Sequence, residues 1–238
     1  MKRIILTGGS SGIGLAATRA FVEAGHTVDV LARGDEEKWR KAAGALADRA
    51  RYHAMDVRRL DAAASLVADI AAERGGVDVL VNNAGVMRFE KGEDASADSI
   101  ALHLETNLAA PIRLSSAALA VMAEQPGGGS ILNVASVAGL KATPKLSAYA
   151  ASKAGLIHYT KCIAAEYADR KVRANAICPG AVQTNLAPRV MFAMIAKGVP
   201  LGRLQTAEEV ARLMAWLVSD EAASVTGGVF SIDGGMSL

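Results

Sequence analysis

Short apolar runs, too continuous to alternate with polar residues, recur along the chain and are separated by segments of helical length. A strand that is apolar on both faces is buried on both, as in a parallel sheet covered by helices. The runs that predict strands are Arg3–Leu6, Thr27–Leu31, Val77–Val81, Ser130–Val134, Val172–Ile177 and Gly228–Ile232, with a less apolar seventh run at Tyr52–Met55. The alternation predicts an α/β fold: a doubly wound parallel sheet (Rossmann fold) flanked by helices.

The pattern runs without a linker or repeat, so we expect a single domain over residues 1–238. Hydrophobic residues make up 51% of the chain and aromatic residues only 4%, which predicts an aliphatic core. Long helices are expected over Ser96–Glu124 and Ser147–Ala168, and the run Gln125–Gly129 ends the first of them. Residues 185–202 combine apolar side chains with helix breakers after a strand, which favours a substrate lid over an ordinary packed excursion.

Charge and cysteine content narrow the possible partners. The formal net charge is +2, and basic side chains near residue 50 are offset by aspartates, so neither nucleic acid nor an anionic membrane is expected. No apolar run approaches the roughly 20 residues that span a bilayer, and Cys162 and Cys178 are predicted to be buried free thiols. We therefore expect a cytoplasmic protein. The histidines lack ligand spacing, so no metal site is predicted; they are His26, His53, His103 and His158.

The first predicted strand runs into a glycine-rich turn, and a helical pattern begins at once. Glycines let the backbone turn tightly and a pyrophosphate approach closely, while the helix N-terminus offers free N–H groups. No Lys-Ser/Thr pair follows, which disfavours a P-loop for nucleoside triphosphates. The spacing T-G-x-x-x-G-x-G resembles that of short-chain dehydrogenases/reductases. The predicted dinucleotide-binding residues of this turn are Gly8, Ser10, Ser11, Gly12, Ile13 and Gly14.

The resemblance makes the end of the second strand informative about the cofactor. NAD-preferring relatives carry an acidic residue there that bonds the ribose hydroxyls, whereas this chain has Ala32 followed by Arg33. An arginine forms charge-assisted bonds with a 2′-phosphate, which an acid would repel. The sequence therefore favours NADP(H) over NAD(H). NAD(H) stays the alternative, because Asp35 lies close by and Ser11 stands where many NADP-preferring relatives have a base.

Other strand ends resemble cofactor-contacting stretches of the family. Asp56 and Val57 match its adenine-edge contact, and Asn82-Asn83-Ala84-Gly85 matches its N-N-A-G signature, which pins central strands and leaves room for the cofactor. A later P-G-x-x-x-T stretch matches the segment that meets the nicotinamide carboxamide. The further cofactor-binding residues implied are Asp56, Val57, Asn83, Ala84, Gly85, Pro179, Gly180, Val182 and Thr184.

The fifth predicted strand ends at Ser136, and Tyr149 and Lys153 open the helix that follows. Side chains four residues apart share one helix face. A phenol with a pKa of about 10 is a poor base at neutral pH, and a neighbouring ammonium group is expected to lower that pKa. The pattern predicts Tyr149 as catalytic acid/base, Lys153 as the group that lowers its pKa and binds the nicotinamide ribose, and Ser136 as the hydroxyl that orients the substrate oxygen.

The Y-x-x-x-K pattern occurs twice, because Tyr167 and Lys171 also match it. That second pair straddles a helix end and the start of the next strand, so its side chains need not share a face. We assign Tyr167 and Lys171 to structure and Tyr149 and Lys153 to catalysis.

The resemblance extends along the whole chain to 3-oxoacyl-carrier-protein reductases and similar proteins, and Asn107 matches the family's catalytic asparagine. It implies an NAD(P)(H)-dependent oxidoreductase that interconverts a carbonyl and a secondary alcohol by hydride transfer. The alternative is a catalytically idle nicotinamide-binding regulatory protein of the same fold. Such proteins typically lose the tyrosine or the lysine, whereas Ser136, Tyr149 and Lys153 are all present.

The expected substrate pocket is apolar, which favours an acyl, alicyclic or steroid-like carbonyl over a free sugar. Lys145 and Arg189 are the two charged side chains that could anchor a substrate. The resemblance also implies a homotetramer. The predicted pocket walls are Met87, Phe89, Leu140, Val182, Met191 and Phe192.

Overall fold

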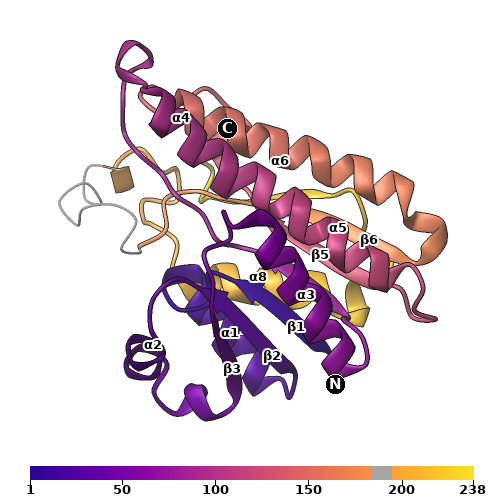
Figure 1. Cartoon of the computed structure of the whole chain (residues 1–238). Helices are drawn as coiled ribbons and strands as arrows, with labels where there is room; N and C mark the ends of the chain where they lie inside the picture. Colours follow the sequence, from indigo (N-terminus) through magenta and orange to yellow (C-terminus); the bar gives the residue numbers. More distant parts are fainter. Residues whose placement is uncertain (184–194) are drawn as a thin grey trace.

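One sheet of seven parallel strands forms the centre of the computed structural model, which describes residues 1–183 and 195–238. The strand order is β3-β2-β1-β4-β5-β6-β7, so the order reverses between β1 and β4 (Figure 1). The strands are β1 (Arg3–Thr7), β2 (Thr27–Ala32), β3 (Ala50–Ala54), β4 (Val79–Asn82), β5 (Gly129–Val134), β6 (Val172–Pro179) and β7 (Val229–Ile232). The predicted single-domain, doubly wound sheet is confirmed, and each predicted strand is present with ends displaced by a few residues.

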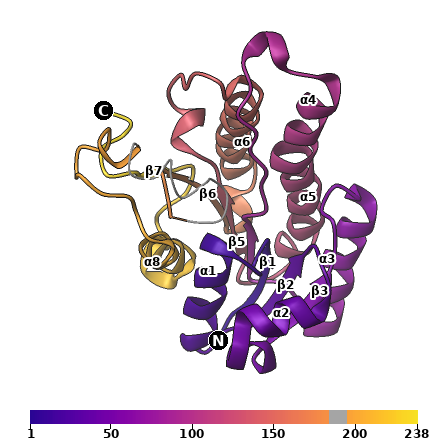
Figure 2. The same cartoon turned by 90° about the vertical axis from the view of Figure 1, so that its left-hand side faces the viewer.

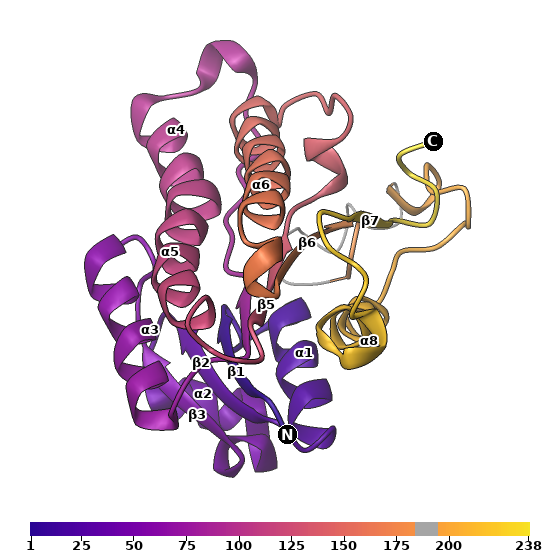
Figure 3. The ribbon, with the colours of Figure 1, turned by 90° about the vertical axis from the view of Figure 1, so that its right-hand side faces the viewer.

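Helices cover both faces of the sheet. The main ones are α1 (Gly12–Glu23), α2 (Glu36–Ala43), α3 (Leu60–Arg74), α4 (Ala97–Leu104), α5 (Ala110–Met122), α6 (Ser147–Glu166) and α8 (Ala207–Val218). Figure 2 shows α1 and α8 on one face and α3, α5 and α6 on the other, and Figure 3 shows the same layers from the opposite side. Aliphatic side chains from the sheet and the helices fill both layers, as the composition predicted. Phe21 of α1 is among the few aromatic residues buried in them.

The long helix expected over 96–124 is α4 and α5, joined without a break by one π-helical turn at Glu105–Ala109. The turn displaces the helix face locally, and Asn107 lies within it. Helix α6 ends at Glu166, two residues before the expected end. The chain turns back there at once: the Val172 amide bonds the Tyr167 carbonyl, and Lys171 adopts the left-handed conformation (φ 58°).

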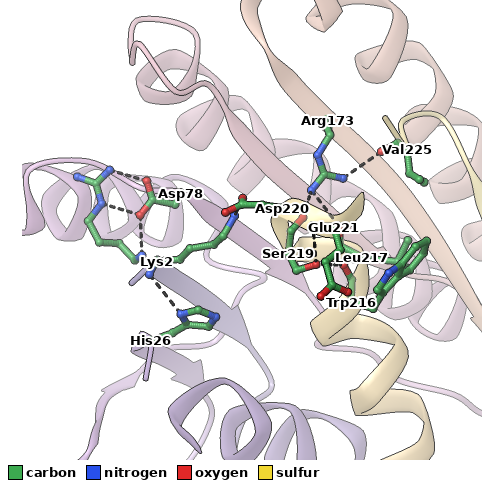
Figure 4. A network of polar contacts seen from close by, with 11 residues as sticks. Lys2, His26, Asp78, Arg173, Trp216, Leu217, Ser219, Asp220, Glu221 and Val225 are labelled. Carbon is green, nitrogen blue, oxygen red and sulfur yellow. Dashed lines mark hydrogen bonds and ion pairs between the residues drawn. The ribbon is translucent and has the colours of Figure 1, made fainter. Parts of the chain in front are cut away.

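Polar contacts at the amino ends of the strands hold the C-terminal part of the chain against β1 (Figure 4). The Lys2 ammonium lies 2.6 Å from the Asp220 carboxylate. The Arg173 guanidinium donates to the carbonyls of Val225 and Leu217 at 3.0 Å each, and so satisfies the end of α8. Because partners here are backbone carbonyls or exposed carboxylates, we interpret this edge as structural.

The two cysteines differ in exposure. Cys178 is buried, but Cys162 is exposed, so the prediction of two buried thiols was wrong; Cys162 lies on the outward face of α6. Within residues 1–183 and 195–238, no group of His, Cys, Asp and Glu has the arrangement of a metal site. The helices of the same part of the chain include none long and apolar enough to span a membrane.

Candidate active site

The carboxyl ends of β1 and β4 meet where the strand order reverses, the usual ligand-binding position of such sheets. The Thr7 hydroxyl accepts hydrogen bonds from the amides of Asn83 and Ala84, each at 3.0 Å. In return the Asn83 side-chain amide donates to the Thr7 carbonyl at 2.9 Å and the Gly8 carbonyl at 3.2 Å. The glycine-rich turn and the N-N-A-G stretch are therefore one rigid unit.

Two glycines of the turn have no space for a side chain. Gly8 has φ +68°, and a Cβ there would lie 2.9 Å from the Ala84 Cα. A Cβ on Gly14 would overlap the Gly8 carbonyl oxygen and lie 2.6 Å from the Asn83 Nδ2. Ser11 precedes α1 without a capping side-chain hydrogen bond, so the first amides of α1 stay available to an anion. The predicted residues Ser10, Ser11, Gly12 and Ile13 all line this helix start.

The rim beyond β2 carries the residues predicted to select the cofactor. Ala32 is buried and Arg33 is exposed at the strand end. Asp35 accepts the Lys38 amide at 2.8 Å as the cap of α2, so its carboxylate is already engaged. Asp56 bonds the Arg58 guanidinium, which holds the pKa of that carboxyl below its usual value, and the charge of Arg33 adds to the effect. Arg33 and Asp56 are thus close together, beside the buried side chain of Val57 (6% exposed).

Ser136, Tyr149 and Lys153 come together although they lie on different elements. Ser136 begins a short turn, and its hydroxyl accepts the Ala138 amide at 3.2 Å. The turn packs tightly on α6, since a Cβ on Gly139 would lie 2.9 Å from the Ala154 amide nitrogen. The buried Lys153 Nζ donates to the Val134 carbonyl at 2.8 Å and lies 5.8 Å from the centre of the Tyr149 ring.

Burial dominates the proton affinities of this cluster. It raises the pKa of Tyr149, and a hydrogen bond with Ser136 opposes the effect. Burial also lowers the pKa of Lys153 to about 8. The net shift of the tyrosine pKa in the protein by itself is therefore upward, because removal from water outweighs the hydrogen bond with Ser136.

Asn107 joins the loop after β4 to α6. Its side chain accepts the Val86 amide at 2.9 Å and donates to the Val86 carbonyl at 3.0 Å and to the Ser152 hydroxyl at 3.1 Å. Ser152 in turn donates to the Tyr149 carbonyl at 2.6 Å. A Cβ on Gly85 would lie 3.3 Å from the Asn107 Oδ1 and 3.6 Å from the Lys153 Nζ. Sequence reasoning missed Ser152, which carries no signal beyond its place between Tyr149 and Lys153.

The segment after β6 starts at the same edge of the sheet, because β6 runs parallel to β5. Pro179 ends the strand, and a Cβ on Gly180 would lie 2.8 Å from the Asp233 Cα, so this glycine allows close approach of the last turn. Val182 is buried and pairs with Gln205. Thr184, Arg189, Met191, Phe192 and most of the predicted lid lie outside the described residues.

The other residues predicted to form pocket walls differ in exposure. Phe89 and Leu140 are 45% and 44% exposed, and Met87 is half-buried. Lys145 is exposed and has φ +65°, and its carbonyl accepts the Glu90 amide at 2.9 Å. The second Y-x-x-x-K pair lies elsewhere: Tyr167 follows the end of α6, and Lys171 follows the short helix Ala168–Arg170.

Comparison with known proteins identifies the class. Residues 8–237 match the family described as "Enoyl-(Acyl carrier protein) reductase". The 3-oxoacyl-[acyl-carrier-protein] reductase of Chlamydia muridarum is 35% identical over 99% of this chain and 97% of that protein. The D-beta-hydroxybutyrate dehydrogenase of Rhizobium meliloti is 35% identical over 98% of each. A Brucella melitensis 3-ketoacyl-(acyl-carrier-protein) reductase, solved with NADH, has a TM-score of 0.93 and 29% identity over 100% of this chain and 98% of that one.

The chain belongs to the short-chain dehydrogenase/reductase family. It is an oxidoreductase whose fold binds a nicotinamide cofactor, and the idle alternative finds no support among these relatives.

Proposed function

We propose that the protein is an NADP(H)-preferring ketoreductase in which Tyr149 donates a proton to the substrate carbonyl during hydride transfer. The observation that carries the proposal is the convergence of Ser136, Tyr149, Lys153 and Asn107 beside the β1–β4 switch point. A nicotinamide dinucleotide fits the residues present: Gly8 and Gly14 let the turn pack tightly against residues 83 and 84, and the start of α1 has uncapped amides. When bound, the reduced nicotinamide supplies the hydride.

The chain's own groups handle the proton. The raised pKa keeps Tyr149 a neutral phenol at neutral pH, which suits proton donation in the reducing direction. The Ser136 hydroxyl, whose interaction with Tyr149 lowers the pKa of the phenol, orients the carbonyl oxygen toward the same phenol. The Lys153 ammonium is held by the Val134 carbonyl beside the tyrosine ring, where its charge stabilises the phenolate left after donation.

Arg33 supports the preference for NADP(H), because its exposed guanidinium extends from the end of β2 near Asp56. Arg33→Ala is expected to raise KM for NADPH by about 10- to 100-fold, because it removes one or two charge-assisted hydrogen bonds to the 2′-phosphate. The KM for NADH should change little. Arg19→Ala, an exposed arginine of α1, is the matched control. Equal KM values for NADPH and NADH in the wild type would refute the preference.

An apolar ketone of the acyl, alicyclic or steroid-like kind is the proposed substrate. The exposed Phe89 and Leu140 at the opening support this choice, as do the acyl and hydroxybutyrate names of the relatives. A panel of such ketones, with a 2-enoyl thioester as comparator, followed by NADPH absorbance, tests both the reaction and the class. Reduction of the enoyl thioester alone would contradict the proposal.

The second Y-x-x-x-K pair provides a control within the same chain. Tyr149→Phe should lower kcat by about 10² to 10⁴, the range for loss of a general acid, while the Kd for NADPH stays within about threefold. Tyr167→Phe changes the same residue type outside the site and should retain kcat. Near-normal turnover by Tyr149→Phe would overturn its role as the acid.

We also propose that the protein forms a homotetramer in the cytoplasm. Ile100 and Leu104 of α4 and Ile112 of α5 are 38% to 40% exposed, which gives these helices an apolar surface for subunit contact. Both cysteines are free, as suits a reducing compartment. Light scattering that gives a monomer mass would contradict the tetramer.

A further inference from the structure

Hydrogen bonds join the α4 helix and its π-turn to the loop that follows β4. Three buried side chains on one face of this helix contact every second residue of that loop. Asn107 bonds the Val86 backbone at 2.9 and 3.0 Å. His103 Nε2 accepts the Arg88 amide at 3.1 Å, and the Ser99 hydroxyl bonds the Glu90 carboxylate. Because the side chains are four residues apart and the loop residues two apart, they form a ladder, defined as Asn107–Val86, His103–Arg88 and Ser99–Glu90.

His103 is the middle rung and is fully buried. Its Nδ1 lies 2.8 Å from the Ser99 carbonyl, which can only accept, so Nδ1 carries the proton and Nε2 is free to accept from Arg88. Both ring nitrogens are therefore used, and the ring plane is fixed. The ring centre lies 6.2 Å from that of Tyr149 at 68°, an edge-on contact.

The ladder lies beside Tyr149 and carries two of the predicted pocket walls. Met87 and Phe89 alternate with its loop residues, and Phe89 is 45% exposed at the opening. The far end of the loop is attached as well, since the Glu90 amide donates to the Lys145 carbonyl just before α6. Apart from the Asn107 rung, none of these contacts belongs to the catalytic cluster described above.

We propose that His103 is a positioning residue that holds the 86–90 loop as the substrate wall and fixes the ring of Tyr149 from its edge. Without it the Arg88 amide has no acceptor and the loop is attached only at its two ends. We expect the effect to fall on the ketone, because the ladder contacts residues 86, 88 and 90 and none of the residues of the glycine-rich turn. This inference rests on the proposed ketoreductase function only for its kinetic part.

The test compares His103→Leu with His158→Leu, which changes an exposed histidine of α6. His103→Leu should raise KM for a bulky apolar ketone about tenfold and lower kcat about tenfold, with the Kd for NADPH within about twofold. His103→Gln keeps an acceptor for the Arg88 amide but no aromatic edge, so it should restore KM and not kcat. A uniform loss of stability with unchanged KM and kcat would overturn the proposal.

Hydrogen–deuterium exchange of peptides that cover 86–90 gives a readout independent of turnover. Exchange should rise about tenfold in His103→Leu and stay at the wild-type rate in His158→Leu. Ser99→Ala removes only the outer rung, so it should raise KM without changing kcat, and it replaces His103→Leu if that variant does not fold. If the wild type reduces no carbonyl, the ketoreductase proposal fails, while exchange at 86–90 still decides the ladder. The ladder is refuted if the 86–90 peptides exchange equally fast in His103→Leu and His158→Leu, or equally fast in Ser99→Ala and the wild type.

Discussion

Lys153 should make the stability of the protein depend on pH in a direction opposite to that of an ordinary ion pair. Its pKa is lowered by burial from 10.5 to about 8. Between these two values the unfolded chain holds the lysine proton more often than the folded one. The free energy of unfolding therefore rises as pH increases through this window. The destabilisation caused by burying the charged ammonium is fully present below pH 8.

The size of the effect follows from the shift. At about 1.36 kcal/mol per pKa unit the full change is about 3 kcal/mol, and between pH 7 and 10 it amounts to about 2.5 kcal/mol. Comparison with Lys153→Met isolates it, because other titrating groups occur in both proteins. Cys178, whose pKa is raised to about 11 by burial, cancels to first order in this way.

Urea unfolding of wild type and Lys153→Met at pH 7, 8.5 and 10, at equal subunit concentration, measures the difference directly. The wild type should gain about 2.5 kcal/mol relative to the variant across this range. Lys171→Met, an exposed lysine of the second Y-x-x-x-K pair, corrects for the change in net charge. A difference that is independent of pH, or that falls as pH rises, refutes the assignment of Lys153 as a buried, destabilised ammonium.

Two further substitutions test the scaffold around the site. Gly14→Ala should abolish NADPH binding and lower Tm, because the new Cβ meets the Gly8 carbonyl. Gly127→Ala adds a Cβ in open space and should change neither quantity. Retained NADPH binding in Gly14→Ala would contradict the role of this turn in binding the cofactor. Asp29→Asn should cost about 3 kcal/mol in urea unfolding at pH 7, since the buried Asp29 bonds Arg74. The lowered pKa of Asp29 means that this contribution is lost as pH falls below about 4, whereas Asp61→Asn, at an exposed carboxylate, should leave stability nearly unchanged.

The sequence predicted the sheet and the positions of most candidate residues because both follow from local pattern. Buried parallel strands are apolar throughout, and their carboxyl ends meet at one edge, so the ends of the apolar runs alone place Thr7, Asn83 and Ser136 at that edge. The two Y-x-x-x-K pairs were also separable, because only Tyr149 and Lys153 begin a helix after a strand end.

The sign of the Tyr149 pKa shift could not be predicted in the same way. The position of the Lys153 charge four residues from Tyr149 can be read from the sequence. The burial of the Tyr149 ring depends on every element of the fold that covers it. His103 from α4, which lies edge-on to the Tyr149 ring, is one residue of that cover. The sequence therefore indicated the opposing charge and not the larger desolvation. The exposure of Cys162 was missed for the same reason, because an apolar run does not show which helix face meets solvent.

The π-turn at Glu105–Ala109 is the step from sequence to site that pattern reasoning could not supply. Asn107 lies in this turn, and its side-chain amide bonds both the Val86 backbone and the Ser152 hydroxyl of α6. A single π-helical turn inside an α-helix is rare and frequently marks a functional site. The α4 helix and its π-turn thus contact both the 86–90 loop and α6, so that in the proposed reaction one element positions the substrate wall and the acid.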